Sequence, residues 1–135
     1  MHTYFAVSDI TAISVAGLKG VSYLDKVTNF SKKTQAEDPI RIASEVDRVY
    51  LDATGTVEIV DPRLGRKIVI RKQGSRSTVL WNPWITKSQQ MPDFGDEEYE
   101  RMVCIESGNV GPNGLKLPPG GCSTLRVELS SVPLA

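Results

Sequence analysis

The sequence predicts an all-β, mainly antiparallel protein that forms a single domain over residues 1–135. A length of 135 residues suits one domain and leaves no room for two. Short runs of apolar and β-branched residues recur at close intervals, separated by Gly, Pro, Asp and Asn, as in antiparallel β proteins. The runs expected as strands are residues 3–7, 12–15, 21–27, 40–51, 57–60, 67–72, 78–81, 102–106 and 124–129.

Glycine and proline mark two connections between these strands. Between residues 57–60 and 68–70, Pro62 presets one backbone angle of a turn and Gly65 accepts a positive φ. We therefore expect the two runs to pair as a hairpin. Five glycines and three prolines in residues 108–121 predict a loop within the domain.

The run at residues 40–51 changes its apolar face. Its apolar residues lie on even positions up to Val46 and on odd positions from Val49 onward. This switch predicts a bulge or bend beside Asp47 and Arg48, and bends of this kind are common next to active sites. The alternative is a solvated ion pair between these two residues at a strand break.

One short helix is expected near residues 94–101. Asp93 can cap its N-terminus, and the acidic residues 96–98 place negative charge in its first turn. Tyr99 and Met102 are three residues apart and would share one face of this helix.

Composition excludes several classes of function. Sixteen Lys and Arg balance sixteen Asp and Glu, so no global field attracts nucleic acid or an anionic membrane. No apolar run approaches the ~18 residues of a membrane span, and residues 1–20 have no basic leader. We therefore expect a cytoplasmic protein without nucleic-acid or membrane partners. Cys104 and Cys122 are expected to be reduced thiols, and their spacing predicts no metal site.

Two ionisable residues are candidates for acid–base chemistry. Glu106 follows residues 102–105, which are apolar on both faces and predict a buried central strand. Desolvation beside a packed sheet raises the pKa of a carboxyl group, as a general base near neutrality requires. His2, the only histidine, is the natural partner acid. The plainer alternatives are a solvated strand end for Glu106 and a frayed, solvated side chain for His2.

Both tryptophans lie within four residues, at the end of the strand expected at 78–81. Sugar sites often use a flat aromatic face with polar groups at its edge, which Trp81 and Trp84 would supply. Core packing is the expected role of at least one of them.

Several strings of residues, in order along the whole chain, resemble the second half of the glucose-6-phosphate 1-epimerase family. These proteins, also called D-hexose-6-phosphate mutarotases, belong to the aldose 1-epimerase or galactose mutarotase-like superfamily. The tail at residues 128–133 is most similar to plant members. The strings are His2-Thr3-Tyr4-Phe5, Val7-Ser8-Asp9-Ile10, Gly17-Leu18 with Tyr23-Leu24-Asp25, Glu45-x-Asp47-Arg48-Val49-Tyr50, Trp81-Asn82-Pro83-Trp84 with Lys87-Ser88, Met91-x-Asp93-Phe94 and Met102-Val103-Cys104-Ile105-Glu106.

The resemblance implies a galactose mutarotase-like β-sandwich that interconverts the α and β anomers of D-glucose 6-phosphate. In this family the histidine of the first string, here His2, is the general acid that protonates the ring oxygen. The glutamate of the last string, here Glu106, takes the proton from the anomeric hydroxyl, and Asp47 binds sugar hydroxyls. The implied partner is a hexose 6-phosphate, and neither a cofactor nor a metal is implied.

The resemblance covers only about half of the family's domain. β-Sandwiches run to ~200–250 residues as one domain, and the part before His2 would supply phosphate-clamping arginines, a second histidine and further strands. A truncated sandwich is expected to leave apolar surface and strand edges open, which favours self-association. The alternatives to an active enzyme are a truncated, non-catalytic sugar-binding module and a partial product with little activity.

Overall fold

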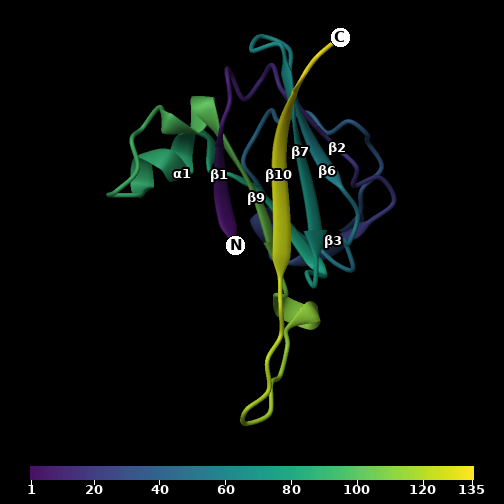
Figure 1. Cartoon of the computed structure of the whole chain (residues 1–135). Helices are drawn as coiled ribbons and strands as arrows, with labels where there is room; N and C mark the ends of the chain where they lie inside the picture. The colour runs from purple at the N-terminus through teal and green to yellow at the C-terminus, as the bar shows by residue number, and fades with distance from the viewer.

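The computed structural model describes residues 1–135 as two packed antiparallel sheets (Figure 1). One sheet has six strands in the order β1-β9-β8-β5-β3-β4, and the other has four in the order β10-β7-β6-β2. The expected all-β, antiparallel architecture is confirmed. The strands are β1 (His2–Ala6), β2 (Ser14–Ala16), β3 (Ser22–Asp25), β4 (Ser31–Thr34), β5 (Val46–Tyr50), β6 (Val57–Asp61), β7 (Arg66–Gln73), β8 (Ser77–Asn82), β9 (Met102–Gly108) and β10 (Arg126–Pro133).

The two sheets share a core of 19 buried hydrophobic residues. The six-stranded sheet contributes Phe5, Val103 and Ile105, and the four-stranded sheet contributes Ile59 and Ile70, among others. Each large aliphatic side chain buried in this way contributes roughly 1.5–3 kcal/mol. The outer strands β1, β4 and β10 keep open edges, whereas a bridge to Ile40 covers part of the β2 edge. Self-association through open edges stays a prediction, which size-exclusion chromatography over a range of concentrations would check.

The hairpin predicted around Pro62 and Gly65 is confirmed. Strands β6 and β7 pair from Val57 opposite Ile70 to Asp61 opposite Arg66. Gly65 has φ of 59°, in the left-handed region that favours glycine.

The bulge predicted in residues 40–51 is wrong. β5 pairs with β8 without interruption over its whole length. Val46 and Tyr50 point into the core, whereas Asp47 and Val49 are buried on the opposite face. The apolar positions change parity because both faces of the strand are covered. Ile40 lies outside the strand and forms an isolated bridge to β2.

The α-helix does not lie where the sequence predicted it. Helix α1 spans Trp84–Gln90, and the acidic segment forms only a 3-10 turn at Glu98–Arg101. The side-chain amide of the buried Asn82 donates to the carbonyl oxygens of Tyr99 and Met102, which ties this segment to the end of β8. None of the helices is long and apolar enough to cross a membrane.

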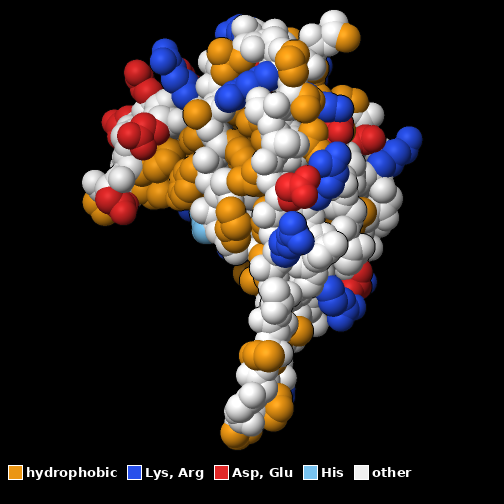
Figure 2. All heavy atoms as spheres, in the orientation of Figure 1, with side chains coloured by type: hydrophobic (Ala, Val, Ile, Leu, Met, Phe, Trp, Pro, Cys, Tyr) orange, Lys and Arg blue, Asp and Glu red, His pale blue; other side chains and the backbone are white.

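The predicted loop forms an arm that projects from the two sheets (Figures 1 and 2). It connects β9 to β10 and contains one 3-10 turn at Gly111–Asn113. Leu115 and Leu117 on this arm are more than half exposed. Cys104 and Cys122 are both free, as the sequence predicted.

Candidate active site

The outer face of the six-stranded sheet carries a row of side chains that crosses five strands. His2 of β1 pairs with Glu106 of β9, which pairs with Val79 of β8. The row continues through Val49 of β5 to Leu24 of β3. Paired residues of neighbouring strands point to the same face of a sheet. The strand register therefore brings His2 and Glu106, which are far apart in the sequence, side by side.

A second row runs beside the first, two residues away from it on each of four strands. It consists of Tyr4, Cys104, Trp81 and Asp47, on β1, β9, β8 and β5. Lys26, from the 3-10 turn that follows β3, extends this row, because its ammonium group lies 3.2 Å from the carboxylate of Asp47.

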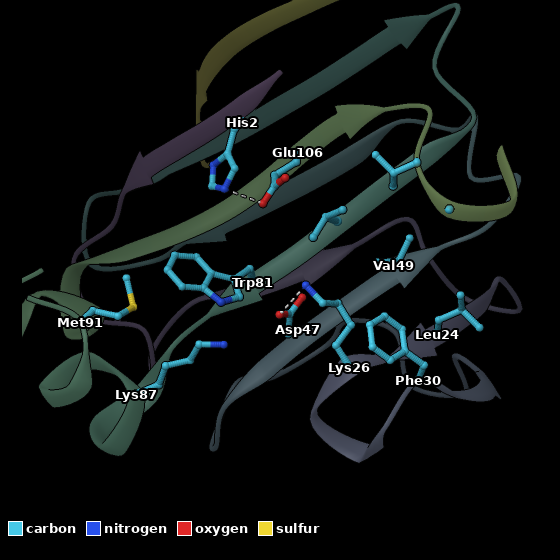
Figure 3. A pocket seen from close by; sticks show the side chains of 13 residues that line it. His2, Leu24, Lys26, Phe30, Asp47, Val49, Trp81, Lys87, Met91 and Glu106 are labelled. Atoms are coloured by element: carbon cyan, nitrogen blue, oxygen red, sulfur yellow. Dashed lines mark ion pairs between the residues drawn. The ribbon is translucent and has the colours of Figure 1, made fainter. Parts of the chain in front are cut away.

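The two rows, apart from Tyr4 and the buried Cys104, form the floor of a pocket of about 650 Å³ (Figure 3). His2, Asp47 and Glu106 all line it, so the three residues predicted as site residues meet in one place. Apolar side chains from β3, β5 and β8 complete the floor, and Lys26 and Lys87 bring positive charge.

His2 and Glu106 are in direct contact. The imidazole Nε2 lies 3.0 Å from the Glu106 Oε1, and the two side chains are 54% and 21% exposed. Burial raises the pKa of Glu106, and the negative charge of Asp47 adds to this shift. The positive charges of His2, the amino terminus and Lys26 oppose it. The direction is the one that a general base near neutrality requires.

His2 is held in place and does not fray. The amino group of Met1 donates to the Ser107 carbonyl at 2.6 Å, and the Ser107 amide donates to the Met1 carbonyl at 3.0 Å. The ring of Tyr4 stacks on the imidazole with centroids 5.1 Å apart, and Trp81 contacts it edge-on at 6.3 Å. Strand pairing and ring packing thus fix the end of the chain, which overturns the expectation of a frayed histidine.

Asp47 and Arg48 do not form the ion pair that was the alternative interpretation. Successive residues of a strand point to opposite faces. Asp47 faces the pocket, whereas the Arg48 guanidinium donates to the Gln35 side chain and lies 5.0 Å from the centre of the Tyr23 ring.

Comparison with known proteins places the chain in a family. The family model described as aldose 1-epimerase matches residues 1–130. The chain belongs to the aldose 1-epimerase family. This family member is 42% identical over 132 residues to a Cenchrus ciliaris protein named "Putative glucose-6-phosphate 1-epimerase", a match covering 98% of the chain and 40% of the relative. An Escherichia coli (strain K12) protein of the same name is 36% identical over 107 residues, covering 79% of the chain and 36% of the relative.

Solved structures share the fold of this aldose 1-epimerase family member. A Salmonella typhimurium protein described as a "putative mutarotase" superposes with a TM-score of 0.80 at 24% identity, over 98% of this chain and 44% of that chain. A "Putative aldose 1-epimerase" of Escherichia coli K12 superposes with a TM-score of 0.68 at 14% identity, over 98% and 49%. These likenesses confirm the mutarotase-like fold. The chain spans about two fifths of the length of the curated relatives described above.

Sequence reasoning missed two groups in the pocket of this epimerase-family chain and a third that is buried beside it. Lys87 lies on α1, the helix that the sequence did not predict, and Lys26 follows β3. Cys104 lies beside the His2–Glu106 pair because of the register between β1 and β9. The signal available in the sequence was the spacing of Cys104 and Glu106, which places them on one face of a strand.

The two tryptophans have different roles in the structure. Trp81 belongs to the pocket floor, whereas Trp84 packs against the core and tilts against the Tyr99 ring, with centroids 5.3 Å apart. The expectation that at least one tryptophan packs in the core is confirmed. Trp81 offers an apolar ring next to the polar groups of His2, Glu106 and Asp47, which is the composition of a sugar-binding surface.

Proposed function

We propose that this chain carries the acid–base site of a glucose-6-phosphate 1-epimerase, which interconverts the α and β anomers of D-glucose 6-phosphate. The observation that supports this most is the contact of 3.0 Å between His2 and Glu106 inside a pocket that also holds Asp47. The anomeric hydroxyl oxygen O1 and the ring oxygen O5 are both bonded to C1 of the sugar. A base and an acid that touch each other in the free pocket are therefore close enough to serve these two oxygens.

The proposed reaction moves two protons and breaks one bond. Glu106 removes the proton from O1 while His2, in its protonated form, donates a proton to O5. The C1–O5 bond breaks, its electron pair goes to O5, and O1 becomes the carbonyl oxygen of the open-chain aldehyde. Rotation about C1–C2 presents the other face of the aldehyde. Ring closure then reverses both proton transfers and gives the other anomer, so Glu106 and His2 return to their starting states.

Asp47 and Trp81 are proposed to hold the sugar over this pair. The Asp47 carboxylate is buried and has Lys26 as its ion-pair partner, so its oxygens are acceptors for sugar hydroxyl groups. The neighbouring Trp81 ring provides the apolar surface against which the C–H groups of a sugar pack.

The two lysines support a phosphorylated substrate. Lys26 and Lys87 line the pocket and supply positive charge for a phosphate dianion. The Lys26 ammonium is held by Asp47, whereas Lys87 faces only Glu45, at 3.5 Å. We assign the larger part of phosphate binding by this chain to Lys87.

We also propose that the enzyme acts in the cytoplasm. Cys104 and Cys122 are unpaired, which fits a compartment that keeps thiols reduced.

Anomer exchange measured by NMR on the 135-residue chain tests this function. With glucose 6-phosphate, we expect exchange faster than the spontaneous rate, but slower by orders of magnitude than with the longer Cenchrus ciliaris protein. Positioning accounts for ~7–11 kcal/mol of a barrier, and substrate groups remote from C1 supply much of the binding energy for it. Titration of the same sample with glucose 6-phosphate identifies the alternative function. Saturable binding with exchange at the spontaneous rate would show a sugar-binding module and contradict the enzyme proposal.

A further inference from the structure

Three side chains of the types that bind transition metals meet at the edge of the pocket, where two of them line it and the third, Cys104, is buried beside them. The His2 imidazole, the Cys104 thiol and the Glu106 carboxylate each offer one ligand atom, and these atoms all lie within 4.8 Å of one another. They come from two strands whose pairing places His2 opposite Glu106 and leaves Cys104 one step along the same face. The sequence spacing alone predicted no metal site, because this cluster depends on the pairing of β1 with β9.

We propose that His2, Cys104 and Glu106 form a binding site for Zn²⁺, or a similar divalent ion with affinity for sulfur and nitrogen, and that the bound ion inhibits the enzyme. The inhibitory part rests on the proposed function. Imidazole, thiolate and carboxylate are the three ligand types that zinc takes in proteins, and three protein ligands leave a fourth position for water.

The distances suit one zinc ion after a small adjustment. With Zn–S of ~2.3 Å and Zn–N and Zn–O of ~2.0–2.2 Å, neighbouring ligands of a tetrahedral ion lie roughly 3.3–3.6 Å apart. The His2–Glu106 separation of 3.0 Å is already close to this range. No two of the three ligand atoms are more than 4.8 Å apart, so the widest pair needs to approach by about 1 Å to reach this range.

Cys104 is a protonated thiol in the free protein, so a bound ion has to displace its proton. Its side chain is fully buried and packs with Trp81 and Met102. Burial and the nearby charge of Glu106 raise the pKa of the Cys104 thiol to about 12, so the free protein holds it protonated. A dication at the site reverses this balance, because it stabilises the thiolate outright. On binding, the S–H bond breaks, its proton passes to solvent and the sulfur electron pair binds the ion, with no change of oxidation state.

Occupancy would remove both catalytic groups at once. A Glu106 oxygen bonded to Zn²⁺ no longer accepts the O1 proton, and a ligated His2 nitrogen no longer carries the proton for O5. The ion also takes the position that C1 of the sugar would occupy between them. Zinc and substrate therefore compete for the same site, and inhibition is reversed by a chelator.

Cobalt(II) is the probe for the site, in a Cys122→Ser background that removes the exposed thiol. We expect one Co²⁺ per chain, with the near-ultraviolet charge-transfer band that marks a thiolate ligand, and its displacement by Zn²⁺ but not by Mg²⁺. Absence of the charge-transfer band in this background overturns the proposal without any change at the site itself.

Substitution of Cys104 distinguishes the proposed site from one formed by His2 and the amino group alone. Circular dichroism first checks that Cys104→Ala is folded. The variant is expected to lose the charge-transfer band and to bind Zn²⁺ at least ~10-fold more weakly. Loss of a residue that only hydrogen-bonds a metal ligand already costs 10- to 100-fold in metal affinity. Equal Zn²⁺ affinity would assign the ion to His2 and the amino group and overturn the proposal.

Anomer exchange then tests the inhibitory part. Cys104 does not line the pocket and has no role in the proposed proton transfers, so Cys104→Ala is expected to keep the basal rate and to lose inhibition by Zn²⁺. Zinc bound through Cys104 without inhibition would overturn this part. Zinc binding by a chain that shows no exchange in the absence of metal would refute the proposed function and leave the metal site standing.

Discussion

Strand β9 turns Val103 and Ile105 toward the core between the sheets, and Cys104 and Glu106 toward the outer face, where Glu106 lines the pocket. Val103, Cys104 and Ile105 are all at most 1% exposed, so burial alone does not distinguish the two faces. They differ in chemistry, because the core face has no charged side chain on this strand whereas the outer face carries the carboxylate of Glu106. Both faces of one strand are thus buried, one for stability and the other for a site.

On the pocket face of β9, substitution of Glu106 is expected to have the largest effect on activity. We expect Glu106→Gln to slow anomer exchange by about 10²- to 10⁴-fold, because loss of a general base removes a contribution of this size. The amide keeps the shape of the side chain but accepts no proton. The matched control is Glu128→Gln on β10 of the other sheet, where an exposed carboxylate pairs with Arg71. A loss of less than tenfold with Glu106→Gln would remove Glu106 from its role as base.

On the core face, the neighbouring residue should affect stability instead. Ile105→Ala is expected to lower the free energy of unfolding by about 2–5 kcal/mol, because it leaves a cavity in the core. Urea denaturation measures this change. The rate of anomer exchange per folded molecule should stay within a factor of two or so, since Ile105 does not reach the pocket. If Ile105→Ala left the midpoint of urea denaturation unchanged but abolished anomer exchange, Ile105 would belong to the site and not to the core.

Local patterns in the sequence were enough for part of the fold. The hairpin of β6 and β7 follows from Pro62 and Gly65, since a turn depends on neighbouring residues. The central position of β9 follows from residues 102–105, which are apolar at every position. The same two-sided burial is why the bulge predicted in β5 is absent. Val46 and Val49 both fit an apolar face, and the sequence does not say that two different faces are covered.

The candidate site was predictable only in part, because it depends on pairing between distant strands. Residue type and pattern singled out His2, Asp47 and Glu106, the resemblance assigned their roles, and the structure brings them to one pocket. Neither the contact of His2 with Glu106 nor the position of Cys104 can be derived without the register of β1 on β9. Lys87 was missed because α1 is short, and its capping signal, Asn82, lies inside a string that was interpreted as the end of a strand with two tryptophans.

The charge that the pocket face carries predicts a preference for phosphorylated sugar. Lys87→Met is expected to raise KM for glucose 6-phosphate by about tenfold, which is roughly 1.4 kcal/mol of lost phosphate binding. The KM for unphosphorylated glucose should not change. Lys116→Met, on the exposed arm, is the matched control. Equal increases of KM for the two sugars would show that Lys87 does not bind the phosphate.

The smallest expected effect is on the pH dependence. The value of kcat/KM should fall as pH is lowered through the pKa of Glu106, because only the carboxylate accepts a proton. Burial and the charge of Asp47 raise this pKa, so the fall begins at a higher pH than for an exposed glutamate with a pKa of about 4.3. Asp47→Asn removes one of these causes and should move the acidic limb to lower pH. If the acidic limb of the kcat/KM profile stayed in place or moved to higher pH in Asp47→Asn, Asp47 would not act on Glu106 through its charge.

The central claim is that His2 and Glu106 serve the two oxygens bonded to C1, and a crystal structure of the Glu106→Gln variant with bound glucose 6-phosphate tests it most directly. We predict O1 at hydrogen-bond distance, about 2.6–3.2 Å, from the side chain of residue 106 and O5 at the same distance from the His2 imidazole. The phosphate should lie toward Lys87. A sugar bound in this pocket with C1 remote from both residues, or bound elsewhere on the molecule, would contradict the account.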